Sequence, residues 1–199
     1  MREVELKGLL TSDAALAAAR ARLEAAGAEL VYEGRLEDKR YDTADRALAA
    51  QDHVLRLRVY RSETVVTSLD FKGPTTYADG FKVREEQTVG ADDPVALARI
   101  LEAMGYIITR EIDREIAQYR HAGAVIRFER YPRMDILVEV EGEPEAIERA
   151  IFTLEMEREG FTAERLPDFV LKYESRTGER AAICDRELLG EYRYSANDA

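Results

Sequence analysis

Polar and apolar residues alternate along several short segments of this chain, a pattern typical of β-strands with two different faces. At the N-terminus, Glu3, Glu5 and Lys7 alternate with apolar residues. Residues two apart share one face of a strand, so this segment places two carboxylates and an ammonium opposite an apolar face. Taken alone, the pattern is more typical of an edge strand whose charged face meets solvent.

The same alternation recurs on five later segments, each with ionic or polar residues on one face. Those faces carry Arg56 and Arg58; Ser68, Asp70 and Lys72; Lys82, Arg84, Glu86 and Thr88; Arg127 and Glu129; and Glu139 and Glu141. Exposed strand faces usually carry scattered polar residues rather than doublets of Arg or Glu. The recurrence therefore favours a closed antiparallel barrel with a charged interior and helices packed on its apolar outside.

The rest of the chain is predicted to alternate between strands and helices. Strands are expected at residues 29–42, 53–61, 64–72, 81–90, 106–120, 124–131 and 135–142, with a short segment at 45–51. Helices are expected from Ser12 or Asp13 to Ala26, from Asp92 or Asp93 to Met104, and from Pro144 to about Glu159. Their starts are marked by capping residues or proline, and residues 73–80 have the composition of a loop.

A charged interior requires ligands, because burying an unpaired charge costs several kcal/mol. Basic side chains suit a multiply charged phosphate chain, since Arg offers a bidentate fork and Lys a point charge. The basic set is Lys7, Arg56, Arg58, Lys72, Lys82, Arg84, Arg114 and Arg127. Carboxylates suit Mg²⁺ or Mn²⁺ that bridges to such a phosphate. The acidic set is Glu3, Glu5, Glu129, Glu139 and Glu141.

These residues resemble the CYTH superfamily, also called the triphosphate tunnel metalloenzymes. The signature ExExK matches Glu3-Val-Glu5-Leu-Lys7, and the similarity continues through Tyr41-Asp42-Thr43, Leu55-Arg56-Leu57-Arg58, Phe71-Lys72-Gly73-Pro74, Arg84-Glu85-Glu86 and Glu139-Val-Glu141. It covers about residues 1–175 and ends near Leu171-Lys172-Tyr173. The resemblance implies an α+β fold, a closed antiparallel eight-stranded β-barrel (a tunnel) with helices outside. The chain is then one domain over residues 1–199, with a polar tail from about residue 180 that is expected to be partly mobile.

Among the branches of this superfamily, the Lys72-Gly73-Pro74 and Arg84-Glu85-Glu86 segments look most like the class IV adenylyl cyclases. That likeness implies a metal-dependent enzyme that converts ATP to cyclic AMP and pyrophosphate. Thiamine triphosphatases and inorganic tripolyphosphatases share the tunnel, so hydrolysis of a triphosphate stays open. The resemblance further implies that Lys7, Lys72, Arg84 and Glu86 are catalytic and that Lys172 joins the triphosphate-binding set.

The alternative to an enzyme is a noncatalytic module that binds a nucleotide or polyphosphate. Retention of both Glu pairs favours catalysis, because a pure phosphate binder needs the basic residues and can lose the metal ligands. The residues that would contact a base stay open. Tyr41, Tyr77 and Phe81 are plausible stacking partners and equally plausible core or loop aromatics.

The composition of the chain restricts the classes of binding partner that we expect. A net charge of −11 argues against nonspecific nucleic-acid binding, which needs a basic field. The chain has no apolar run long enough to span a bilayer and no secretory leader, so a cytoplasmic location is expected. Cys184 is the only cysteine, which excludes an internal disulfide. The expected partner is ATP or another small triphosphate, with no nucleic acid and no membrane, and a homodimer is open.

Overall fold

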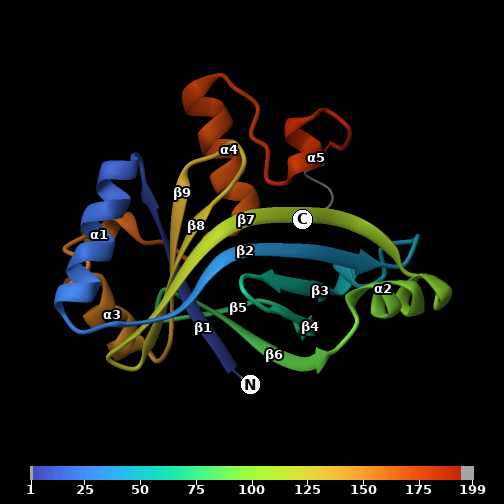
Figure 1. The fold of residues 1–199 in the computed structure, drawn as a ribbon, viewed down its shortest axis with the longest axis horizontal. Coiled ribbons are helices and arrows are strands. Elements are labelled where there is room, and N and C mark those ends of the chain that lie inside the picture. The colour runs from blue at the N-terminus through green and yellow to red at the C-terminus, as the bar shows by residue number, and fades with distance from the viewer. Residues whose placement is uncertain (1, 194–199) are drawn as a thin grey trace.

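A computed structural model describes residues 2–193, and one antiparallel sheet is its main feature (Figure 1). The strands are β1 (Arg2–Leu10), β2 (Glu29–Asp42), β3 (Val54–Arg61), β4 (Val65–Lys72), β5 (Thr76–Ala78), β6 (Phe81–Ala91), β7 (Ile107–His121), β8 (Ala124–Arg130) and β9 (Ile136–Glu141). The helices are α1 (Asp13–Ala25), α2 (Pro94–Ala103), α3 (Pro144–Thr153), α4 (Leu166–Thr177) and α5 (Asp185–Leu188). Short 3₁₀ turns lie at Ala49–Gln51 and Arg158–Gly160.

Eight of the strands close into a ring. Their order is β1-β9-β8-β7-β2-β3-β4-β6, and β6 pairs back with β1, while β5 adds a short hairpin arm to β6. The closing pair sets Glu3 opposite Arg84 and Glu5 opposite Lys82. The ring confirms the predicted α+β tunnel fold, and closure leaves each of the eight strands with a neighbour on both sides.

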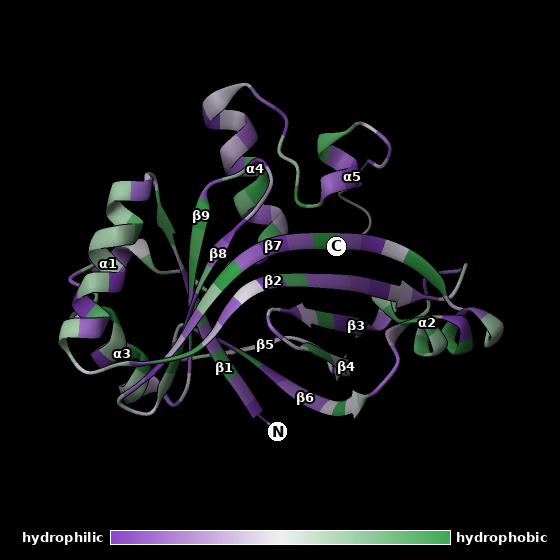
Figure 2. Ribbon diagram, viewed as in Figure 1, coloured by the Kyte–Doolittle hydropathy of each residue, from purple (hydrophilic) through white to green (hydrophobic). Residues whose placement is uncertain are grey.

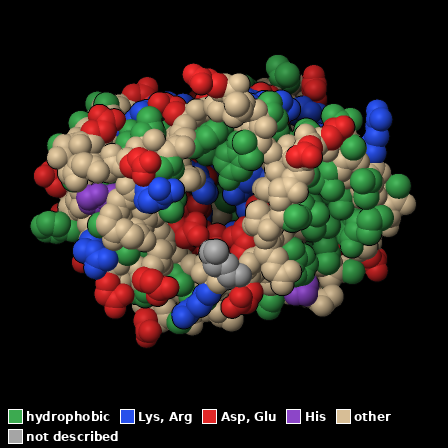
Figure 3. All heavy atoms as spheres, turned by 60° about the horizontal axis from the view of Figure 1, so that its bottom comes forward, with side chains coloured by type: hydrophobic (Ala, Val, Ile, Leu, Met, Phe, Trp, Pro, Cys, Tyr) green, Lys and Arg blue, Asp and Glu red, His purple; other side chains and the backbone are tan. Residues whose placement is uncertain are grey.

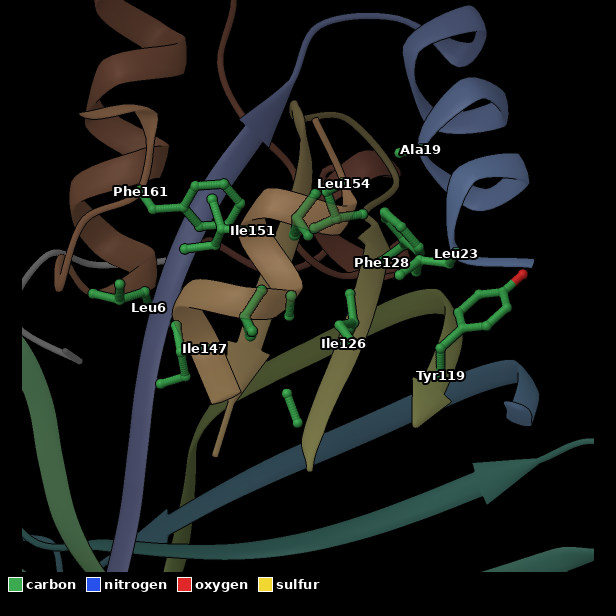
Figure 4. Close-up of a cluster of buried hydrophobic side chains, with 14 of the residues drawn as sticks. Leu6, Ala19, Leu23, Tyr119, Ile126, Phe128, Ile147, Ile151, Leu154 and Phe161 are labelled. Atoms are coloured by element: carbon green, nitrogen blue, oxygen red, sulfur yellow. The ribbon is translucent and has the colours of Figure 1, made fainter. Parts of the chain in front are cut away.

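The outer face of the ring carries apolar clusters at two opposite ends, and helices cover both clusters. Figure 2 shows hydrophilic stretches along β2 and β7 that are interrupted by hydrophobic residues. At one end α1 and α3 pack on the sheet through side chains such as Leu6, Leu23, Ile126 and Ile147, all at most 1% exposed (Figure 4). At the other end, α2 packs Leu101 against β3. Burial of this apolar area stabilises the ring from outside.

An apolar cluster around α4 closes part of the inner face. Leu9 and Leu137 are register partners two residues beyond Lys7 and Glu139, so they share the inner face with those charges. The cluster joins Ile112, Tyr131 and Leu137 to Leu166, Phe169 and Val170 of α4. One region of the ring interior is therefore apolar and occupied, and the charged region lies beside it.

Several local predictions are wrong. The predicted loop at 73–80 contains β5, and the helix predicted to reach Glu159 ends at Thr153. Glu155, shortly after that end, adopts the left-handed conformation with φ of 51°, which does not continue a helix. Helices α4 and α5 were not predicted.

The predicted polar tail is partly structured. Ala182 is fully buried and pairs with Arg133 in an isolated bridge, and Ile183 accepts a backbone hydrogen bond from Asp113 at 2.8 Å. Burial raises the pKa of the neighbouring Cys184 thiol to about 12, so this cysteine stays protonated. The rest of the predicted tail, residues 194–199, lies outside the described residues.

Among the described helices, none combines the length and the apolar character needed to cross a membrane.

Candidate functional site

The ring encloses a cavity of about 140 Å³ that is lined mainly by charged side chains. Figure 3 looks into its opening, where acidic side chains lie along one edge and basic side chains lie behind them. Every predicted acidic and basic site residue lines this cavity except Lys172. The alternating charges of separate strands therefore meet at one place, as a closed tunnel requires.

The acidic side of the cavity comes from β1 and β9. The Lys72 ammonium contacts Glu3 at 2.6 Å, and the Lys7 ammonium bridges Glu5 at 2.8 Å and Glu139 at 2.5 Å. Burial raises the pKa of Glu5, but Lys7 outweighs it with help from Lys82, and the pKa falls to about 2. These carboxylates are thus held as anions by lysines of the tunnel itself.

Glu141 differs from its neighbours because, among residues 2–193, it makes no ion pair. It faces Glu5 across the β1–β9 pair. Burial, followed by the charges of Glu139 and Glu3, raises its pKa to about 7. Acidic neighbours destabilise the anionic form of this carboxylate, and a bound cation would relieve that repulsion.

The predicted metal set is only partly assembled. Within the described part of the chain, no three acidic or His/Cys side chains converge on one point as a ready metal site. The carboxylates do not converge because oxygens of Glu3, Glu5 and Glu139 form ion pairs with lysine ammonium groups. Glu129 is the least available, because Arg114 donates to one of its oxygens at 2.8 Å and the Tyr131 hydroxyl donates to the other at 2.6 Å. The oxygen donor set suits Mg²⁺ or Mn²⁺ in its chemistry.

The basic side of the cavity is organised by Asp38, a residue that the sequence reasoning missed. Its carboxylate contacts Arg58 at 3.0 Å, Arg114 at 3.1 Å and Arg56 at 3.5 Å. Burial raises the pKa of Asp38, but Arg114, Arg58 and Arg56 outweigh it and hold the pKa well below its ordinary value. One buried carboxylate therefore orients arginines from two neighbouring strands.

Other contacts position the remaining cations. The Arg56 guanidinium donates to Asp70 at 2.8 Å, and Arg127 donates to Glu139 at 2.7 Å. Arg84 has no carboxylate at close range among the described residues. Its Nε donates to the Gly73 carbonyl at 2.7 Å instead. This contact gives the Lys72-Gly73-Pro74 segment a structural role, since it orients Arg84 toward the cavity.

Lys172, predicted to bind the triphosphate, is a site residue that the structure does not bring to the cavity. Its ammonium pairs with Glu164 at the surface, its side chain is 52% exposed, and it does not line the cavity. Helix α4 instead brings Arg165, at its N-terminal end, to the cavity wall, where Arg165 pairs with Asp52 at 3.1 Å.

The three aromatic residues considered as base contacts also lie elsewhere. Tyr41 and Phe81 are buried in apolar clusters on the outside of the ring, and Tyr77 is 61% exposed. Two rings do line the cavity. The Tyr131 hydroxyl is bound to Glu129, and the His53 ring lies 5.2 Å from the Phe71 ring.

Comparison with known proteins gives one sequence match and several structural ones. The sequence profile of the CYTH domain family matches residues 1–177. No curated protein matches the chain. A solved structure from Pyrococcus horikoshii has 23% sequence identity and a TM-score of 0.69, with 85% of this chain and 98% of that chain covered.

Two further solved structures have descriptions that name an activity. A candidate adenylate cyclase from Vibrio parahaemolyticus has 18% identity and a TM-score of 0.71, covering 85% of this chain and 97% of its own. A Hippeastrum protein, described as a candidate adenylyl cyclase with a dominant triphosphatase activity, has 17% identity and a TM-score of 0.60, covering 90% and 97%. At these identities the similarity shows a shared fold.

Replacing Asp38 with Asn should lower the free energy of unfolding at pH 7 by about 3–5 kcal/mol, because buried arginines lose their shared counter-charge. Asp13→Asn is the control. Its side chain is 78% exposed and pairs with Arg130, so its loss should cost less than about 1 kcal/mol.

The pH dependence has a defined sign. The pKa of Asp38 is depressed in the folded state, so its stabilisation is present above the unfolded value of about 3.9 and is lost as the pH falls toward the folded value. Urea titrations between about pH 5 and pH 2 should therefore show a steeper loss of stability in the wild type than in Asp38→Asn. Equal slopes would contradict the assignment.

Proposed function

The chain belongs to the CYTH domain family, and we propose that it is a metal-dependent enzyme that cleaves a triphosphate held in its tunnel. One observation carries this proposal. A single cavity joins the carboxylates of Glu3, Glu5, Glu139 and Glu141 to a wall of lysines and arginines. Basic groups that bind a polyanion, next to oxygen ligands for a divalent cation, are what phosphoryl chemistry uses.

The lysines and arginines of the cavity would bind the triphosphate by exchanging some of their carboxylate partners for phosphate oxygens. Lys72 bridges Glu3 and Glu86, and Arg58 rests on Asp38. These pairs offset part of the desolvation penalty of the cations inside the ring until phosphate oxygens replace some of the contacts. Arg56, Arg58, Lys72 and Arg84 would then neutralise the charge that grows on the leaving group as the bond breaks.

Glu3, Glu5, Glu139 and Glu141 would hold Mg²⁺ or Mn²⁺, with Glu129 secondary because both of its oxygens are engaged. A bound divalent cation supplies Lewis-acid polarisation of phosphate oxygens. Lys7 would act by its charge. Burial lowers its pKa, but Glu139 and Glu5 raise it above the ordinary value, so Lys7 stays an ammonium and is unsuited to be a general base.

Cyclisation of ATP is the first candidate reaction. The ribose 3′-hydroxyl releases its proton to solvent and its oxygen forms a bond to the α-phosphorus. The bond from that phosphorus to the oxygen that bridges it to the β-phosphorus breaks, and pyrophosphate leaves. Support comes from the cyclase-like Lys72-Gly73-Pro74 and Arg84-Glu85-Glu86 segments, and from the fold shared with the Vibrio protein described as a candidate adenylate cyclase.

Hydrolysis of a triphosphate is the second candidate, and the cavity wall favours it in one respect. The Arg114 guanidinium lies 6.0 Å from the centroid of the Tyr131 ring, and the Phe71 ring lies 5.2 Å from the His53 ring. The two rings that line the cavity therefore already have cation or ring contacts, which makes them less available for stacking on a base. Water would then attack the terminal phosphorus, and the organic group on the triphosphate would be irrelevant. The dominant triphosphatase activity named for the Hippeastrum protein agrees with this alternative.

Product analysis distinguishes these reactions. Incubation with ATP and Mn²⁺ should give cyclic AMP and pyrophosphate in equal amounts, and EDTA should abolish turnover, because the carboxylates cannot act without a cation. Tripolyphosphate and thiamine triphosphate serve as parallel substrates. Orthophosphate with ADP, or faster turnover of tripolyphosphate, would assign the protein to hydrolysis. Tight binding without turnover of any of these substrates would indicate that the protein is a noncatalytic binding module.

Arg58→Ala should raise KM and lower kcat for the preferred substrate, because both the ground state and the transition state lose a charge-assisted bond. The loss in kcat/KM should be about 10- to 100-fold. Arg61→Ala is the matched control, since Arg61 lies on the same strand with a side chain 47% exposed and pairs with Glu37 outside the cavity. Unchanged kinetics in a folded Arg58→Ala protein would mean that this face does not meet substrate.

A further inference from the structure

Arg40 lines the cavity as a cation that no acidic side chain neutralises at close range. It lies on β2, two residues from Asp38, and therefore on the same inner face. Within residues 2–193 its guanidinium makes no ion pair, and its Nε is shielded from solvent without a hydrogen-bond partner. None of the sequence motifs of the family resemblance includes this residue.

The other cavity cations contrast with Arg40, because the protein supplies each of them with an acceptor. Carboxylates contact Lys7, Lys72, Lys82, Arg56, Arg58, Arg114, Arg127 and Arg165, and carbonyls contact Arg84. Among the described cations of the cavity, Arg40 is thus the exception.

The immediate neighbours of Arg40 increase this imbalance. In the strand register it lies opposite Arg56 on β3 and opposite Arg110 on β7. Asp38 is the acidic group nearest in sequence, and its oxygens contact Arg56, Arg58 and Arg114 rather than Arg40. Burial, followed by the charges of Arg110 and Arg56, lowers the pKa of Arg40 well below its ordinary value. Arg40 therefore lies next to other guanidinium groups rather than beside a carboxylate that pairs with it.

We propose that Arg40 is a substrate-binding residue whose guanidinium binds a phosphate oxygen of the triphosphate. The proposal rests on the proposed function and adds to it a specific anchor. Arg58 must give up part of its contact with Asp38 to reach a phosphate, whereas Arg40 gives up no carboxylate. A guanidinium whose Nε is shielded from water and that has no carboxylate partner can bind an entering oxyanion without first breaking an ion pair.

This role predicts opposite effects on the free protein and on the complex. Without an anion, Arg40 destabilises the fold, so Arg40→Gln should melt at a temperature a few degrees higher than the wild type. With inorganic tripolyphosphate in metal-free buffer, the Kd of Arg40→Gln should be about tenfold or more above that of the wild type. A merely structural arginine would predict the reverse change in melting temperature, since its removal would destabilise the free protein.

The test is calorimetric titration with tripolyphosphate, together with melting curves in its presence and absence. Arg120→Gln is the control, because its side chain is 63% exposed and pairs with Glu29 at the surface. It should bind and melt as the wild type does. Arg40→Lys keeps the charge but not the fork, so its Kd should lie between those of the wild type and Arg40→Gln. It also serves as the test should Arg40→Gln fail to fold.

The outcomes separate the two proposals. A wild type that binds tripolyphosphate, with equal Kd values for the wild type and either Arg40 variant, would overturn the role of Arg40 and leave the proposed function standing. A wild type that binds neither tripolyphosphate nor ATP would overturn both.

Discussion

Charged side chains that face the inside of the eight-stranded ring have lost most of their contact with water, and the arrangement of the site follows from how they are neutralised. Glu5 is 4% exposed and Asp38 is 1% exposed. Such groups stay ionised only beside opposite charges. Asp38 therefore holds arginines on one side of the cavity, and Lys7 holds carboxylates on the other. The ring closure makes these pairs necessary, because it brings the charged faces together away from solvent.

The same pairs explain how a polar interior coexists with a stable fold. The apolar outer face and its helices supply the burial that stabilises the ring, and the inner ion pairs keep the charges from opposing it. Two groups stand outside this balance. The Glu141 carboxylate lies near other carboxylates, and the Arg40 guanidinium lies near other guanidinium groups. Each marks a place where a ligand of opposite charge, a cation for Glu141 and a phosphate oxygen for Arg40, would complete the pairing.

Most of the ring could be predicted because period-two alternation is a property of single strands. Asp38 could not be found in this way, since Glu37, Asp38, Lys39 and Arg40 form a run of charges without alternation. Only pairing with β3 reveals that Asp38 faces inward against Arg58.

Helix α4 could have been predicted from a sequence pattern that the sequence reasoning did not use. Leu166, Phe169 and Val170 have helical spacing, and Pro167 occupies the first turn. The position of Lys172 was inferred from resemblance alone. The path of α4 turns that side chain toward Glu164, which no pattern within a single strand predicts.

We infer that the internal ion pairs occupy the positions that a triphosphate and its metal would take. A crystal structure with a non-hydrolysable ATP analogue and Mn²⁺ tests it most directly, with manganese located by anomalous scattering. The account predicts phosphate oxygens on Lys72 and Arg58, manganese on oxygens of the β1 and β9 glutamates, and loss of the 2.5 Å contact between Lys7 and Glu139. An analogue bound outside the tunnel, with the ion pairs of Lys7 and Asp38 unchanged, would contradict it.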